Sequence, residues 1–171
     1  GRMAYDVYQD LLFVQGFSGG FLNRGIFLNP TIGTTGVGAL GGVVQTLVTD
    51  QFWVGAMAFD ANAKSAEFDL DTIREGEFLK SVEVGWTASR DRFKVDRAHV
   101  TFWEKDEREE AGATRGAGWV FSSSYELSDG FIPFLRFGES NGGAGVAAER
   151  SAAAGFQLEL REDRIWSLGA M

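Results

Sequence analysis

Five polar or charged residues that could do chemistry lie in the middle of segments that otherwise have the composition of β-strands. They are Glu83, Arg97, His99, Ser122 and Arg136. A histidine and a serine could form a hydrolytic site, in which the imidazole takes the hydroxyl proton. Neither Ser122 nor Ser124 lies in the strand–turn–helix motif that presents such a nucleophile. We therefore expect no catalytic residue and no enzyme.

Two short acidic motifs could indicate a cation site. Asp60-Ala-Asn62 and Asp69-Leu-Asp71 contain carboxylate and amide oxygens, but they lack the twelve-residue loop with its glycine and closing glutamate. The chain has no cysteine, which excludes disulfides and thiolate ligands. We interpret both motifs as turns and expect no metal and no cofactor.

The segments 77–88 and 93–104 are predicted to form the hairpin that positions these side chains. In the first arm Glu83 has the opposite parity to Val82 and Val84, because strand side chains alternate with period two. One face is therefore apolar, with aromatic residues near its ends, and the other carries charges in mid-strand. The remaining predicted strands are 37–48, 51–59, 116–127, 131–139, 148–160 and 165–170.

Short and long connections alternate between these predicted strands. This alternation is expected of strands that run up and down through a bilayer, each about 10 residues long. It predicts an all-β fold, an antiparallel up-and-down transmembrane β-barrel over residues 37–171, with about eight strands present. Residues 1–36 are predicted to be an irregular segment or loop with short elements.

Composition narrows the classes of function. The chain of 171 residues has 23 glycines, 2 prolines and a net charge of −8. No basic stripe is present to bind phosphates, so we expect no nucleic-acid partner. Two alternatives to a membrane pore stay open: a soluble β-barrel that binds a ligand with its apolar face inward, and a small closed eight-stranded outer-membrane protein.

Several segments resemble the carbohydrate-selective porins of the OprB type, in the same order along most of the chain. They are Phe59-Asp-Ala-Asn62, Glu83-Val-Gly-Trp-Thr87, Arg97-Ala-His-Val-Thr-Phe-Trp103, Ser122-Ser-Ser124, Pro133-Phe-Leu-Arg-Phe-Gly-Glu-Ser140 and Ala153-Ala-Gly-Phe156. The resemblance implies a bacterial outer-membrane porin through which sugars diffuse passively. Its partners would be small sugars and outer-membrane lipid, and the sequence is compatible with a homo-oligomer. Such barrels have roughly sixteen strands, so we expect this chain to correspond to about half of one.

In that setting the polar face would line the pore. Aromatic faces stack on sugar C–H surfaces, and charged planar groups reach neighbouring hydroxyls. The predicted pore-lining residues are Glu83, Arg97, His99, Trp103, Ser122, Phe134 and Arg136, with Trp103 and Phe134 as stacking surfaces. Counting back from a turn at 89–92 places Glu83 beside Arg97 and His99. A simpler alternative is that Glu83 and Arg97 only neutralise each other.

Overall fold

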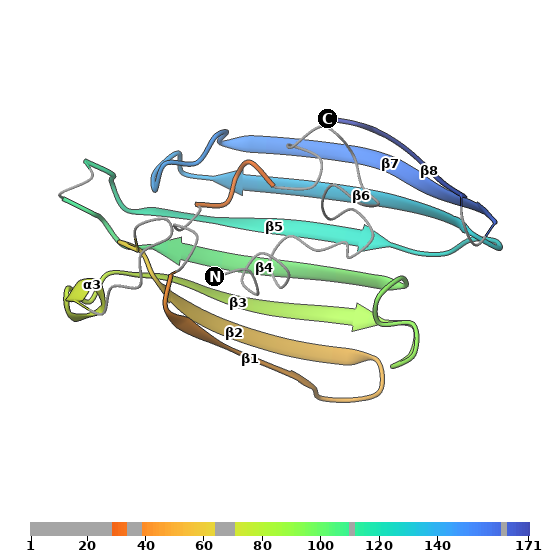
Figure 1. Cartoon of the computed structure of the whole chain (residues 1–171), viewed down its shortest axis with the longest axis horizontal. Helices are drawn as coiled ribbons and strands as arrows, with labels where there is room; N and C mark the ends of the chain where they lie inside the picture. Colours follow the sequence, from red (N-terminus) through yellow and green to blue (C-terminus); the bar gives the residue numbers. More distant parts are fainter. Residues whose placement is uncertain (1–28, 34–38, 64–70, 110–111, 162–163) are drawn as a thin grey trace.

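One eight-stranded antiparallel sheet forms the body of the protein (Figure 1). The computed structural model describes residues 29–33, 39–63, 71–109, 112–161 and 164–171. Each strand pairs with its neighbours along the chain, in the order β1(Gly41–Leu47), β2(Phe52–Asp60), β3(Phe78–Thr87), β4(Arg97–Lys105), β5(Gly116–Ser124), β6(Phe131–Ser140), β7(Arg150–Arg161) and β8(Arg164–Ala170). The predictions of an all-β fold and of up-and-down connectivity are confirmed.

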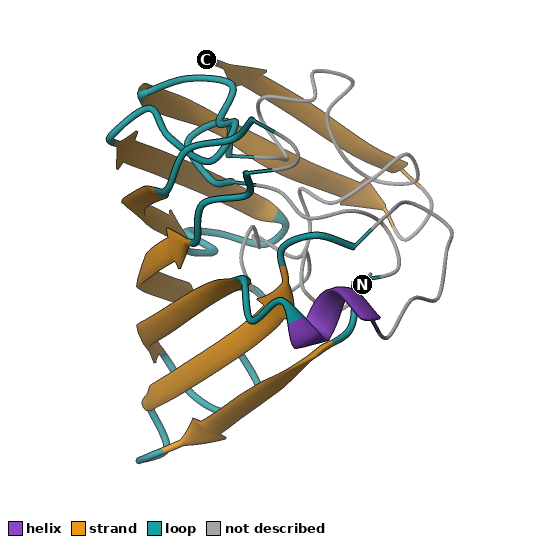
Figure 2. Ribbon diagram, turned by 90° about the vertical axis from the view of Figure 1, so that its left-hand side faces the viewer, coloured by secondary structure: helices purple, strands orange, loops and turns teal. Residues whose placement is uncertain are grey.

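The sheet curves into an open arc (Figure 2). In the described part of the chain, β1 pairs only with β2 and β8 only with β7, so these eight strands do not close into a barrel. Strands β2 to β7 have between 9 and 12 residues. This is close to the 9–11 residues or so that a tilted strand needs to cross a bilayer.

The connections lie at two ends of the sheet (Figure 1). The described parts of the connections 61–77 and 106–115, and the connection 141–149, lie at the end that also holds the short helix α3(Asp71–Arg74), here named the α3 end. Connections 48–51, 88–96 and 125–130 lie at the opposite end, named the Phe93 end. No helix in the described residues is long and apolar enough to cross a membrane.

The strict alternation of short and long connections fails at residues 88–96. The predicted second arm of the hairpin began at Phe93, but β4 begins at Arg97. The reason is local: the backbone N–H groups of Val95 and Asp96 both donate to the carbonyl of Arg92, at 2.9 and 2.8 Å. These bonds coil the chain into a turn, and this connection becomes about as long as 106–115 at the other end.

The predicted alternation of side chains between the two faces is confirmed. Apolar side chains are on the exposed face and polar side chains are on the buried one, which is the reverse of a water-soluble sheet. In β3, Val82 and Val84 are 54% and 50% exposed, whereas Glu83 between them is 2% exposed. The same holds in β4 to β6, where Phe102, Leu135 and Phe137 are exposed and charged or hydroxylated side chains are buried. Alternating side chains point to opposite faces of a strand, so the middle of one face is apolar and exposed, and Lys80 on the same face lies nearer its border.

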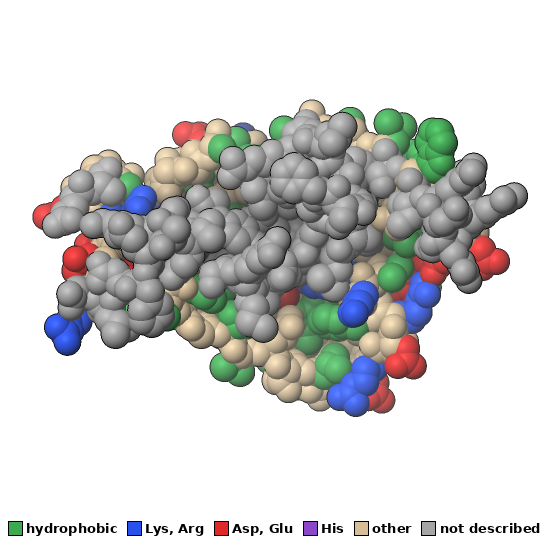
Figure 3. All heavy atoms as spheres, in the orientation of Figure 1, with side chains coloured by type: hydrophobic (Ala, Val, Ile, Leu, Met, Phe, Trp, Pro, Cys, Tyr) green, Lys and Arg blue, Asp and Glu red, His purple; other side chains and the backbone are tan. Residues whose placement is uncertain are grey.

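Surface charge gathers towards the two ends of the sheet (Figure 3). At the α3 end, Lys80 pairs with Asp106 at 2.8 Å, and Arg150 Nη2 lies 2.8 Å from Glu139 Oε1. A further pair joins Arg115 to Glu104. The exposed apolar face is therefore bordered on this side by ion pairs.

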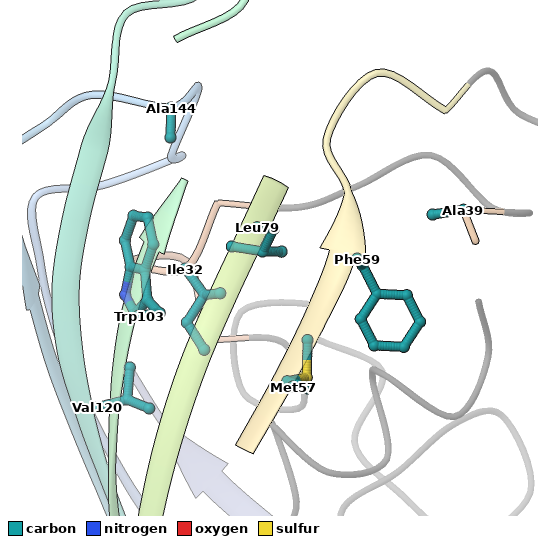
Figure 4. Packing of buried hydrophobic residues seen from close by; sticks show 8 residues of the cluster. All are labelled: Ile32, Ala39, Met57, Phe59, Leu79, Trp103, Val120 and Ala144. Atoms are coloured by element: carbon teal, nitrogen blue, oxygen red, sulfur yellow. The ribbon is translucent and has the colours of Figure 1, made fainter. Parts of the chain in front are cut away.

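A small hydrophobic cluster lies on the buried face (Figure 4). Its members include Ile32, Met57, Phe59, Leu79, Trp103, Val120 and Ala144. Ile32 belongs to the only described part, residues 29–33, of the predicted irregular segment 1–36, and residues 1–28 and 34–36 lie outside the described residues. The Pro30 carbonyl accepts from the N–H groups of Ala147 and Ala148, which fastens the segment 29–33 to the connection between β6 and β7.

Candidate functional site

Three of the predicted pore-lining residues form one row across the buried face. His99 of β4 pairs with Ser122 of β5, and Ser122 pairs with Arg136 of β6. Arg136 Nε donates to the Ser122 hydroxyl at 3.3 Å. All three are buried. These three residues therefore lie in one register row, at the same level of the sheet.

Glu83 lies nearer the α3 end than the row of His99, Ser122 and Arg136, and several hydrogen-bond donors hold its carboxylate. Its Oε1 accepts from the indole N–H of Trp53 at 2.9 Å and from the Gln45 amide at 3.4 Å. Its Oε2 accepts from the Thr101 hydroxyl at 2.7 Å, and His99 Nε2 lies 3.9 Å from it. A buried carboxylate is stabilised by such bonds, since each one replaces lost hydration.

The predicted register of the hairpin was wrong. Glu83 is opposite Thr101, whereas His99 is opposite Gly85 and Arg97 is opposite Thr87. The cause is the coiled turn at 92–96, which lengthens the connection and slides β4 along β3. Glu83 still approaches His99 diagonally, but Arg97 lies four residues further along the hairpin. Arg97 instead contacts the rings of Trp53 and Phe93.

Arg97 lies against two aromatic rings near the Phe93 end. Its guanidinium carbon lies 5.0 Å from the ring centroids of both Trp53 and Phe93, within the range of cation–π attraction. The two rings meet edge to face at 4.8 Å. Arg97 Nη2 also lies 3.5 Å from His99 Nδ1. Glu83, Trp53, Arg97 and His99 therefore belong to one connected cluster.

The two predicted stacking residues are buried in the protein. Trp103 is 3% exposed and packs in the hydrophobic cluster with Ile32 and Ala144. Phe134 is 2% exposed, and its ring lies against Gly155 of β7. In this structure neither ring offers an open face to a ligand.

Sequence reasoning missed Trp53, Phe93, Gln45 and Thr101. Trp53 could have been found, since it has the inward parity in β2 and shares it with Gly55 and Met57. Phe93 could not, because it was placed inside a strand rather than in the connection whose fold turns it onto Trp53.

Ionic hydrogen bonds fix the connection 88–96 in place. Arg92 Nε lies 2.7 Å from Asp96 Oδ2, and Arg92 also pairs with Glu126 beyond β5. The backbone N–H of Gly130 and the Arg92 guanidinium donate to Glu126 and hold the pKa of its carboxyl below the ordinary value. Burial pushes the pKa of Asp96 upward, but bonds from Arg92 and from the Glu126 N–H outweigh it, and the net shift is downward.

A hollow of about 530 Å³ opens beside this cluster at the Phe93 end. It is lined by Gln45, Thr46, Leu47, Trp53, Arg90, Asp91, Phe93 and Lys94. Its walls combine an aromatic ring with an amide, a carboxylate and cations. Such walls can bind a neutral polar molecule through stacking and hydrogen bonds.

The buried face therefore supplies hydrogen-bond donors and acceptors at several levels of the sheet. Among the described residues, no group of three or more His, Asp or Glu side chains could hold a metal ion. Comparison with protein families, with curated proteins and with solved structures finds no match for this chain.

Proposed function

We propose that the chain forms part of a porin of the bacterial outer membrane, through which carbohydrates diffuse passively along a polar lumen. The observation that carries the proposal is the inverted sheet, with an exposed apolar face and a buried face that carries Glu83, Arg97 and Arg136. A barrel in a bilayer needs this arrangement, because its outer surface contacts hydrocarbon and its interior holds water.

The borders of the apolar face support a membrane position. Two outward-facing aromatic residues are Trp86, near the Phe93 end of β3, and Trp119, in the half of β5 nearer the α3 end. The Lys80–Asp106 pair lies nearer the α3 end than Trp119, and the Arg150–Glu139 pair lies in the register row of Trp119. Outer-membrane barrels have an apolar band about 25 Å tall between aromatic girdles.

The unpaired edges of the sheet require additional strands in a bilayer. Among the described strands, β1 and β8 each leave one edge without a partner strand. A backbone N–H or C=O group that faces hydrocarbon without a hydrogen bond costs on the order of several kcal/mol. We propose that further strands pair with both edges and complete a wider barrel, in line with the resemblance to sixteen-stranded porins.

Carbohydrate is the proposed solute class because of the resemblance and of the chemistry of the buried face. Thr101, Ser122 and Gln157 add hydroxyl and amide groups to the charged residues. Planar charged groups and hydroxyls exchange hydrogen bonds with sugar hydroxyls as they do with water. The buried face carries these polar groups beside the hydrophobic cluster, and the exposed apolar face favours a membrane barrel over a soluble ligand-binding barrel.

Swelling of liposomes tests the proposal. Protein that holds these eight strands together with the strands proposed to complete the barrel is folded in detergent and reconstituted, and the liposomes are placed in isotonic glucose, maltose or a large dextran. We expect swelling in glucose and maltose and none in dextran, because only small solutes fit a pore. Protein that folds as a monomer without detergent, or liposomes that swell no faster than protein-free ones, would contradict the proposal. A closed eight-stranded barrel would also leave the liposomes unswollen, because its interior is filled by side chains.

A further inference from the structure

The hollow at the Phe93 end has the size and the walls of a small-molecule site. Its volume of about 530 Å³ falls inside the general range of about 300–1,000 Å³ for ligand pockets. It lies between the strand pair β1–β2 and the connection 88–96, away from the row formed by His99, Ser122 and Arg136.

Phe93 is the aromatic wall of the hollow. Its ring is half-buried: it stacks on Arg97 and meets Trp53 edge to face, and its remaining surface lines the hollow. Trp53 is fully buried, so it supports Phe93 from behind rather than offering a face of its own. A ring held on one side and open on the other is suited to stacking against the C–H face of a ligand.

The polar groups around the ring include donors and acceptors. Asp91 and the carbonyl oxygen of the Gln45 side chain can accept hydrogen bonds, whereas Arg90 and Lys94 can donate them. Arg90, Asp91 and Lys94 are exposed, so a ligand can reach them. The alternation of acceptors and donors within one rim matches neighbouring hydroxyls, each of which both donates and accepts.

The connection that carries Phe93 is held in a defined position. Arg92 binds Asp96 and Glu126, and the Ser124 hydroxyl donates to the Val95 carbonyl at 2.5 Å. The bonds join residues on both sides of Phe93 to the sheet. A binding group that is already fixed loses less conformational entropy when a ligand binds.

We infer that this hollow is a binding subsite for a single neutral hexose ring at the Phe93 end of the pore, with Phe93 as the stacking platform and Asp91 and Gln45 as hydroxyl partners. The inference rests on the proposed function, because it places the subsite at one mouth of the proposed lumen. The subsite is separate from the pore-lining residues predicted from the sequence, such as Ser122 and Arg136, which are buried deeper in the protein.

Ligand-observed saturation-transfer NMR tests the subsite directly. The full chain is folded in a detergent without a sugar headgroup, and glucose is added at millimolar concentration. We expect saturation to reach the glucose ring protons, and Phe93→Ala to reduce that signal at least fivefold while Phe93→Tyr retains it. The matched control is Phe102→Ala, which removes an exposed ring from the apolar face and should leave the signal unchanged.

Asp91→Ala provides a second variant in case Phe93→Ala does not fold, because Asp91 is exposed and lies outside the bonds made by Arg92. A glucose signal that stays unchanged in every folded variant of Phe93 and Asp91 would overturn the subsite. Glucose-driven swelling of liposomes that persists in those variants would leave the proposed function standing. Wild-type protein that binds glucose through Phe93 but causes no swelling would instead contradict the porin proposal alone.

Discussion

The indole of Trp53 lies over Gly85 on the neighbouring strand and donates its N–H to Glu83 at 2.9 Å. Gly85 is what allows this, because a Cβ atom there would lie 2.0 Å from Cζ2 of the indole. A Cβ atom at Gly55, which is paired with Glu83, would make only ordinary contacts with Gln45 and the Val44 carbonyl. Gly85 and Trp53 therefore set the position of a buried charge.

Removing the donor of this bond should destabilise the fold. Trp53→Phe keeps an aromatic ring but leaves Glu83 with fewer donors, and an unsatisfied buried group costs about 1–3 kcal/mol. Urea unfolding in phospholipid vesicles measures the loss. Trp166→Phe is the matched control, since Trp166 is 63% exposed, and its effect should be within about 0.5 kcal/mol. Equal effects of the two changes would show that the Trp53–Glu83 bond contributes nothing.

Adding one methyl group at Gly85 should displace the Trp53 indole. The expected cost of Gly85→Ala is about 1–3 kcal/mol, as for other overpacked positions. Near-ultraviolet circular dichroism should change as well, because the indole leaves its fixed environment. Gly42→Ala serves as the control, since a Cβ there meets nothing within 4 Å. A Gly85→Ala protein with the stability and spectrum of the Gly42→Ala protein would refute the close approach.

Acid should loosen the connection 88–96 before it unfolds the sheet. The pKa values of Asp96 and Glu126 lie below their ordinary values in the folded protein. A carboxyl group whose folded pKa is lowered binds its proton more tightly in the unfolded chain, so its stabilisation is complete above the ordinary pKa of about 4. That stabilisation is lost as the pH falls through the folded pKa.

Proteolysis at residues 88–96 should therefore accelerate below about pH 4, where the ordinary carboxyl groups begin to bind protons. An acid-active protease such as pepsin provides the measurement between pH 5 and pH 2. In the Glu126→Gln protein the cleavage should already be faster at pH 5 and should depend less on pH. If wild type and Glu126→Gln show the same pH profile, the Arg92 bonds do not hold the connection.

The strands and their faces could be predicted from the sequence, because each depends only on local alternation. The order Val82, Glu83, Val84 places the two valines on one face and the glutamate on the other, and this holds for any pairing with the neighbouring strand. The register could not be predicted, since it depends on how residues 92–96 fold. The bonds from the Val95 and Asp96 N–H groups to the Arg92 carbonyl form the turn that shifts β4 along β3 and so moves Arg97 away from Glu83.

The aromatic residues Trp103 and Phe134 lie on the buried face as predicted, but their packing could not be predicted from the sequence. Parity alone assigned Trp103 and Phe134 to the inner face, but it could not show that Ile32, far away in the chain, packs against Trp103 in the hydrophobic cluster. Phe93 reaches Trp53 only through the folded connection 88–96. Contacts between distant segments are not encoded in the alternation of a single strand.

In a membrane barrel the exposed apolar face of this sheet contacts lipid. Val84 lies in mid-strand and Phe78 at the first residue of β3, both with the outward parity. In a bilayer, an arginine at the midplane costs about 2–4 kcal/mol and one near the interface about 0–1 kcal/mol. The free energy of unfolding of Val84→Arg and Phe78→Arg, measured in phospholipid vesicles, should therefore differ by about 2 kcal/mol or more. Equal losses at the two positions would show that depth does not matter and would contradict the membrane position of this sheet.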